Sequence, residues 1–262
     1  MKLKIYQVDA FTDKLFGGNP AAVILLDNWL REGLMQTIAS ENNLAETAFL
    51  VKNSGCYEIR WFTPAVEVDL CGHATLAAAH VLFNHLNHNS NEIVFISDRS
   101  GMLKVKKEGA LLKLDFPADD FDEIETPQLL IEGLNITPIE THKGKTDYMA
   151  ILATQEEVEE LAPDFVKLAA LGERGVIVTA KGDVVDFVSR FFAPQSGINE
   201  DPVTGSAHTT LTPYWSEKLD KTELTAIQIS PRKGHLQCRF LGDRVEISGN
   251  AVTYLVGEIT VA

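Results

Sequence analysis

The segment at 62–76, FTPAVEVDLCGHATL, has a counterpart at 192–211, FAPQSGINEDPVTGSAHTTL. In both copies an aromatic strand-like run ends at a proline, and a loop carrying carboxylates follows. A glycine with a polar neighbour then opens an Ala-rich or Thr-rich helical segment. A repeated segment of this kind indicates two similar supersecondary units. We therefore expect two similar lobes that face each other.

The patterns around the repeat predict an α/β fold. An acidic stretch at 117–127 resembles a solvated linker, which places the expected lobes at 1–117 and 118–262. Helical spacing predicts a helix at 29–41, and the apolar 74–86 predicts a helix enclosed by other structure. A third helix is expected at 204–219, where Pro213 would break or kink it. Alternating or β-branched runs predict strands at 3–11, 21–26, 46–51, 57–62, 176–179, 184–192, 236–240, 244–247 and 252–261.

Composition and charge favour a small-molecule protein. The 262 residues are 45% hydrophobic and carry a net charge of −14, so the averaged field repels nucleic acid and anionic membranes. The longest apolar run near the N-terminus, 21–26, is too short to cross a bilayer. Three cysteines, an odd number, give no disulfide framework and indicate a reducing, cytoplasmic setting. We expect neither a nucleic-acid nor a membrane partner.

The two glycine-led helix starts are candidate anion sites. A helix N-terminus offers unpaired N–H groups and partial positive charge, and glycine lets an anion approach closely. Gly72-His73 and Gly205-Ser206 would then bind one small anionic substrate in a cleft between the lobes. The alternative at this stage is that both are ordinary glycine-assisted helix entries.

The sequence lacks the motifs of nucleotide, hydrolase and metal sites, which leaves acid/base chemistry by side chains as the expected kind of catalysis. No nucleotide-binding loop or nucleophile elbow appears, and the histidines at 80, 85 and 88 lack the partners of a metal site, so no cofactor or metal is expected. Glu46 opens an apolar strand, where partial desolvation would raise its pKa, although a solvent-exposed strand end is the alternative. The candidate carboxylates are Glu46, Glu67, Asp69, Glu200 and Asp201.

Seven segments, in order along the whole chain, resemble the PhzF-like family of phenazine biosynthesis. They are 8–11 (VDAF), 18–23 (GNPAAV), 43–49 (NLAETAF), 62–64 (FTP), 71–75 (CGHAT), 200–207 (EDPVTGSA) and 248–252 (SGNAV). The resemblance implies the diaminopimelate epimerase-like fold: two pseudo-symmetric lobes, each a mixed curled sheet around a central helix, with the active-site cleft between them. It also implies a homodimer and a cofactor-independent isomerase of a biosynthetic process.

The resemblance also assigns roles to particular residues. Glu46 matches the family's proton-transferring glutamate, and Gly72, His73, Asp201, Gly205 and Ser206 match its substrate-holding groups. Epimerases of this fold use one cysteine in each lobe, whereas here Cys71 has no counterpart in the second copy. A proton shift by one base is therefore expected on a small carboxylate-bearing metabolite. Two alternatives stay open: an epimerase or lyase that uses Cys71 as a thiol base, and a non-catalytic protein that binds small anions.

Overall fold

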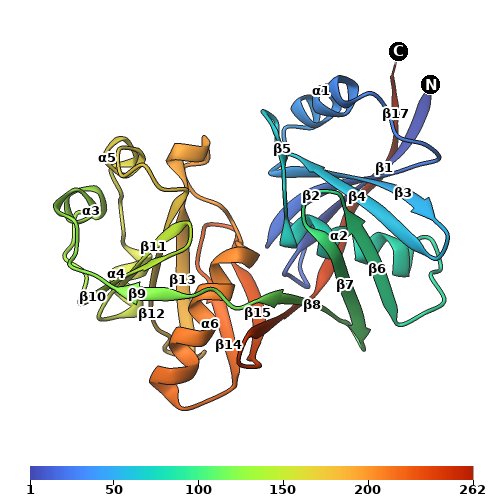
Figure 1. Ribbon diagram of the computed structural model, residues 1–262. Coiled ribbons are helices and arrows are strands. Elements are labelled where there is room, and N and C mark those ends of the chain that lie inside the picture. The colour runs from blue at the N-terminus through green and yellow to red at the C-terminus, as the bar shows by residue number, and fades with distance from the viewer. Residues whose placement is uncertain (262) are drawn as a thin grey trace. The chain divides into compact units, whose positions relative to one another are not determined.

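The computed structural model describes residues 1–261 and divides the chain into two compact units, whose elements Figure 1 labels. Unit 1 comprises Met1–Asp115 and the chain from Ser248 onward, and unit 2 comprises Phe116–Ile247. None of the helices within the described residues combines the length and the apolar composition that a membrane-spanning helix needs.

The boundaries of the units differ from the expected lobes in two places. β17 (Ala251–Thr260) pairs antiparallel with β1 (Lys2–Ala10), from Lys2 opposite Thr260 to Ala10 opposite Ala251, so the chain's last strand belongs to unit 1. The expected second lobe, 118–262, is therefore wrong at its C-terminal end. The linker expected at 117–127 is also wrong, because it contains β9 (Phe121–Glu123), which pairs with a strand of unit 2.

Unit 1 is a mixed sheet curled around one helix. β1 lies between β17 and β2, β2 runs parallel to β3, and β4 pairs with β3, β5 and β6. Its remaining elements are β2 (Asn19–Leu26), α1 (Glu32–Asn42), β3 (Glu46–Asn53), β4 (Cys56–Phe62), β5 (Glu67–Val68), α2 (Gly72–Asn84), β6 (Glu92–Ser97), β7 (Gly101–Glu108) and β8 (Leu111–Pro117), the last of which runs into unit 2.

The central helix of unit 1 is α2, as its composition predicted. It packs against β1, β2, β3 and β17, and the alanines at 77, 78 and 79 are fully buried. The alanines let the strands approach the helix backbone closely, and the larger buried side chains Leu76, Val81 and Leu82 fill the remaining space inside the sheet. This packing fixes the direction of the helix and so the position of its N-terminal residues Gly72 and His73.

Unit 2 has a comparable plan of its own. Its strands pair in the order β9, β10, β11, β12, β13, β14 and β15, with β11–β12 and β13–β14 parallel. The elements are β10 (Glu140–Gly144), β11 (Asp147–Ile151), β12 (Gly175–Lys181), β13 (Phe187–Phe192), β14 (Glu223–Gln228), β15 (Gly234–Phe240), β16 (Arg244–Gly249), α3 (Gln128–Leu134), α4 (Gln155–Glu159), α5 (Phe165–Ala169), η1 (Pro194–Ser196) and α6 (Gly205–Leu219). β16 leads the chain back to unit 1.

Helix α6 passes through Pro213 without ending. A proline has no N–H, so the carbonyl oxygen four residues earlier, that of Thr209, loses its helical donor. The backbone N–H of Asp119 donates to this oxygen at 3.1 Å. The helix therefore continues to Leu219, because the freed acceptor is satisfied by a neighbouring segment of unit 2.

His208 on α6 should make unfolding depend on pH. Its side chain is fully buried, its Nδ1 donates to the Thr204 carbonyl oxygen at 2.8 Å, and burial lowers its pKa to about 4. The unfolded chain takes up this proton near pH 6.5 but the folded chain does not. The resulting stability is complete above about pH 6.5 and decreases toward pH 4, by on the order of 3 kcal/mol.

Denaturant unfolding of wild type and His208→Gln across this pH range checks the expectation. Between pH 6.5 and pH 4 the free energy of unfolding should decrease less in His208→Gln than in the wild type. The control His235→Gln, at an exposed position on β15, should show the same pH dependence as the wild type. Parallel pH curves for wild type and His208→Gln would contradict the assignment.

Candidate active site

Glu46, Cys71 and His73 form a buried cluster in unit 1 at the start of α2. The Oε2 atom of Glu46 lies 3.0 Å from Nε2 of His73, and their side chains are 12% and 5% exposed. The Sγ atom of Cys71 lies 3.4 Å from Nδ1 of His73, and Nδ2 of Asn19 lies 3.2 Å from the same nitrogen. The residue expected to transfer protons thus contacts a residue expected to hold the substrate.

The local sequence explains how Glu46 reaches the helix. Asn43 ends α1 in the left-handed conformation, with φ of 49°, and the chain turns within a few residues into β3. β3 begins at Glu46 and pairs in parallel with β2, so that Glu46 lies opposite Ala21. Parallel strands that start together bring Asn19 and Glu46, at their N-terminal ends, to one edge of the sheet.

The cluster favours a charged pair between Glu46 and His73. Burial alone would lower the pKa of His73, but its neighbours Cys71 and Glu46 outweigh burial and raise that pKa well above its usual value. Burial raises the pKa of the Cys71 thiol to about 11, so the thiol is neutral near pH 7. With the thiol neutral, the contact that still raises the pKa of His73 is the one with Glu46, 3.0 Å from Nε2.

Two of the five candidate carboxylates are used in matching ion pairs of the repeat. Arg60 Nε contacts Glu67 Oε1 at 2.6 Å in unit 1, and Arg190 Nε contacts Glu200 Oε1 at 2.8 Å in unit 2. Each arginine also lies over the phenylalanine two residues later, Phe62 or Phe192, at 5.2 and 4.9 Å from the ring centroid. The hydrogen bond from Arg60 lowers the pKa of Glu67. The ion pairs of Glu67 and Glu200 therefore stabilise the loops before the two helices, which makes both carboxylates poorer candidates for proton transfer.

The remaining two carboxylates have different surroundings. Asp69 is exposed and pairs with Arg99 at 3.0 Å on the surface of unit 1. In unit 2, Asp201 Oδ2 accepts a hydrogen bond from Thr204 Oγ1 at 2.5 Å, and its carbonyl oxygen accepts one from Gln228 Nε2 at 2.7 Å. Asp201 is thus held in a fixed position immediately before α6.

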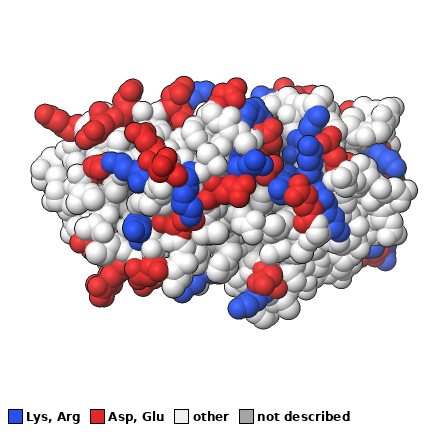
Figure 2. Space-filling model, turned by 90° about the horizontal axis from the view of Figure 1, so that it is seen from below, with Lys and Arg blue, Asp and Glu red and all other residues white. Residues whose placement is uncertain are grey.

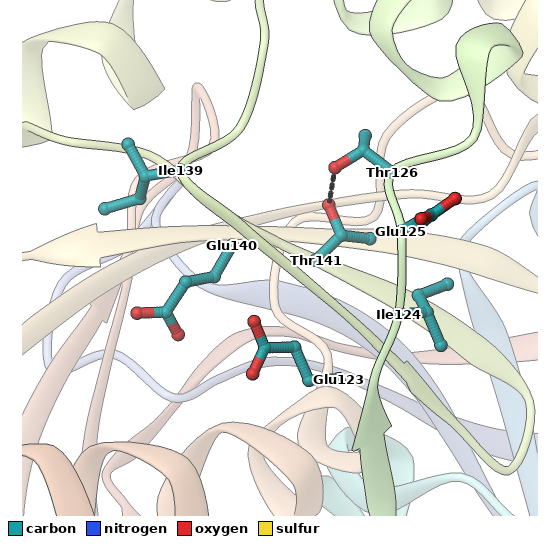
Figure 3. A pocket seen from close by; sticks show the side chains of 7 residues that line it. All are labelled: Glu123, Ile124, Glu125, Thr126, Ile139, Glu140 and Thr141. Atoms are coloured by element: carbon teal, nitrogen blue, oxygen red, sulfur yellow. Dashed lines mark hydrogen bonds between the residues drawn. The ribbon is translucent and has the colours of Figure 1, made fainter.

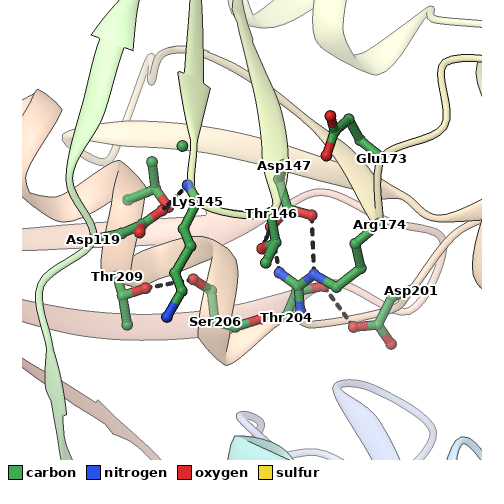
Figure 4. A network of polar contacts seen from close by, with 12 residues as sticks. Asp119, Lys145, Thr146, Asp147, Glu173, Arg174, Asp201, Thr204, Ser206 and Thr209 are labelled. Carbon is green, nitrogen blue, oxygen red and sulfur yellow. Dashed lines mark hydrogen bonds and ion pairs between the residues drawn. The ribbon is translucent and has the colours of Figure 1, made fainter.

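The first turn of α6 carries a polar network, shown in Figure 4. Arg174 Nη1 donates to Ser206 Oγ at 3.0 Å, while Arg174 Nε donates to Asp147 Oδ1 at 3.0 Å. Lys145 lies in the turn between β10 and β11, with its backbone N–H 3.4 Å from Asp119 Oδ2. Neither α6 nor α2 has a side-chain hydrogen bond at its N-cap, and each helix start carries the partial positive charge of its N-terminus.

An open cavity of about 470 Å³ in unit 2 has none of the candidate residues in its lining (Figure 3). It is lined by Glu123, Ile124, Glu125, Thr126, Ile139, Glu140 and Thr141. The Glu140 carboxylate in its wall is already bonded by Tyr214 and Lys218, at 2.9 and 2.8 Å. Its acidic lining would repel a carboxylate substrate, so the cavity is a poor candidate for the site.

Charged side chains elsewhere give no sign of a nucleic-acid surface on the face drawn in Figure 2. The Lys and Arg side chains on this face lie among Asp and Glu side chains rather than in a separate basic patch. A polyanion needs an extended basic surface, and this face does not provide one.

Two polar residues of these sites were missed in the sequence. Asn19 lies within a segment that resembles the family, and the available signal was a polar residue at the start of an apolar run. The structure buries it completely. Arg174 follows an ordinary Gly-Glu pair, and no motif distinguishes it from other surface arginines. The contacts of both residues depend on tertiary structure.

The fold places this chain in the diaminopimelate epimerase-like structural class. A hydroxyproline epimerase from Agrobacterium vitis shares the fold, with a TM-score of 0.61 at 10% identity over 98% of this chain and 92% of that one. At such low identity the likeness concerns the fold alone.

The family model described as phenazine biosynthesis-like protein matches residues 8–257, and the chain belongs to this family. An uncharacterized isomerase of Pseudomonas aeruginosa is 53% identical over 260 residues, which is 99% of each chain. The crystal structure of a PhzF-family protein from Enterococcus faecalis has a TM-score of 0.97 at 48% identity and covers 100% of both chains. The expected family and fold class are thereby confirmed.

Proposed function

We propose that this chain is a cofactor-independent isomerase that moves a proton between two carbon atoms of a small carboxylate-bearing metabolite. Glu46 is the proposed acid/base. The observation that supports the proposal is the 3.0 Å pairing of Glu46 with the buried His73 at the start of α2, whose N-cap has no side-chain hydrogen bond. Relatives that are named isomerases support the reaction class.

The proposed reaction begins with removal of a proton from carbon by the Glu46 carboxylate. The C–H bond breaks, and its electron pair moves into the adjoining unsaturated carboxylate of the substrate as an enolate. The N–H groups of the first turn of α2 and the imidazolium of His73 stabilise this negative charge. Glu46 then returns the proton to a second carbon on the same face, so that no proton is gained or lost.

The residues around the start of α6 are proposed as substrate-binding groups. Gly205 and Ser206 begin α6, and the guanidinium of Arg174 bonded to Ser206 adds positive charge there. Asp201, fixed by Thr204, is suited to accept a hydrogen bond from a hydroxyl or amino group. We propose that these residues bind the polar substituents of a small anionic metabolite.

A thiol base at Cys71 is a less favourable reading of the same site. With its pKa raised to about 11 by burial, the Cys71 thiol provides little thiolate near pH 7. Unit 2 contains one further cysteine, Cys238, which lies on β15 and not in the loop before α6. A two-thiol mechanism therefore lacks its second group there.

Deuterium incorporation from D₂O tests the proposed function. The protein is incubated with a panel of small amino, cyclic and unsaturated carboxylic acids, with EDTA present, and carbon-bound deuterium is followed by NMR. We expect incorporation at carbons next to, or conjugated with, a carboxylate in at least one compound. Compounds that bind without incorporation would instead favour a non-catalytic anion-binding protein.

A further inference from the structure

The cluster at the start of α2 also has the composition of a metal site. A carboxylate oxygen of Glu46, Sγ of Cys71 and a ring nitrogen of His73 all lie within 4.8 Å of one another. Thiolate, imidazole and carboxylate together form a ligand set that zinc accepts. Cys71 and His73 are two residues apart, but Glu46 lies 25 residues before Cys71, so the sequence shows no complete three-ligand spacing and no metal site was predicted.

The distances in the cluster are close to those of a tetrahedral zinc site. Nε2 of His73 is 3.0 Å from Glu46 Oε2 and 4.0 Å from Cys71 Sγ. Bonds to zinc of about 2.0–2.3 Å place the ligand atoms of a tetrahedral site roughly 3.3–3.6 Å apart. Small side-chain rotations would bring all three atoms onto one ion.

An independent observation also points to a cation. The Oε2 atom of Glu46 is buried, and its 3.0 Å ion pair with Nε2 of His73 lacks the alignment of a hydrogen bond. A buried carboxylate oxygen without an aligned donor is costly, and a bound cation would satisfy it.

Asn19 can hold the histidine in the form that binds metal. A metal-bound imidazole usually donates its other N–H to a neighbouring acceptor. The Asn19 amide lies 3.2 Å from Nδ1 of His73, and a half-turn of this amide would present its oxygen to Nδ1–H.

We propose that Zn²⁺ binds Glu46, Cys71 and His73, with the fourth position open to water, and that the bound ion inhibits the enzyme. Binding replaces the thiol proton of Cys71 and the Nε2 proton of His73 with bonds to the metal, and both protons pass to solvent. Inhibition rests on the proposed function, because the ion occupies the carboxylate that would transfer the proton. Binding of the ion does not depend on that function.

Cobalt substitution tests the binding site without any turnover. EDTA-treated, reduced protein is titrated with Co²⁺, and the wild type should show a sulfur-to-cobalt charge-transfer band and tetrahedral ligand-field bands at one ion per chain. Cys71→Ser should lose the charge-transfer band, and its affinity for Zn²⁺ should fall by about 100-fold or more, since changes to outer-shell partners alone cost about 10–100-fold. The matched control is Cys56→Ser, which removes a more accessible thiol outside the cluster and should leave the bands unchanged.

X-ray absorption of the zinc-loaded wild type supplies a measurement that needs no variant. We expect one sulfur neighbour with nitrogen and oxygen neighbours around the ion. A cobalt spectrum without a thiolate band, a band lost in Cys56→Ser rather than in Cys71→Ser, or zinc without a sulfur neighbour would each overturn the proposal. Deuterium incorporation measured with EDTA stays informative in every case, so failure of the metal site and failure of the isomerase function are distinguishable.

Discussion

Glu46→Gln is expected to reduce deuterium incorporation and turnover by about 100-fold to 10,000-fold, the range that general acid–base groups contribute. The amide keeps the size of the side chain but cannot take up a proton from carbon. Folding should be retained, because His73 can release its proton to solvent instead of remaining a buried, unpaired cation. Rates are measured by NMR in D₂O with the substrate found in the panel, and folding by thermal melting.

A second readout separates the proton-transfer role from a structural one. Glu46 helps to raise the pKa of His73, so this pKa should fall in Glu46→Gln when the imidazole signals are followed by NMR. Glu41→Gln, an exposed change near the end of α1, is the matched control and should alter neither rate nor pKa. Full turnover in Glu46→Gln would remove Glu46 from the mechanism.

Gly18→Ala is expected to lower the free energy of unfolding by about 3–5 kcal/mol. A Cβ atom at this position would lie 2.0 Å from the Ala10 carbonyl oxygen, and φ is +59°, which L side chains rarely adopt. The carbonyl belongs to the end of β1 and cannot move without disturbing its pairing with β2. Because Asn19 follows directly, the contact of its amide with His73 should be disturbed as well.

Gly101→Ala provides the comparison for this change. Gly101 also has positive φ, +71°, but a Cβ atom there would meet nothing within 4 Å. Gly101→Ala should therefore lower the free energy of unfolding only by the cost of holding an alanine at positive φ, about 1 kcal/mol. Chemical denaturation of both variants measures the difference, and equal stabilities would show that the overlap with Ala10 is relieved without cost.

The local parts of this fold were predictable because their patterns are local. The buried helix 74–86, the strand that opens with Glu46 and the repeated loop-helix segments all occur in the structure as α2, β3 and the starts of α2 and α6. Patterns of side-chain polarity determine such elements within a few residues. The pairing of β17 with β1 was not predictable in this way, because it joins opposite ends of the chain.

The candidate site was predictable in part for the same reason. The sequence distinguished Glu46 from its neighbours by its apolar strand, but it could not show that Glu67 and Glu200 are each held by an arginine. Nor could it show that Cys71 and His73 lie against Glu46, since the three come from two elements separated by a hairpin. Whether a carboxylate is free to carry a proton is decided by such tertiary partners.

The pairing of the chain's two ends has a consequence for biosynthesis. The ribosome synthesises the segment with Glu46, Cys71 and His73 early. However, β1 lacks one of its two neighbouring strands until residues 251–260 have been translated. Unit 2 is formed by one continuous segment, Phe116–Ile247, so its strands can pair with one another before β17 has been synthesised. Completion of the unit 1 sheet should therefore wait for the synthesis of β17, and nascent chains stalled before β17 should stay protease-sensitive in their N-terminal half.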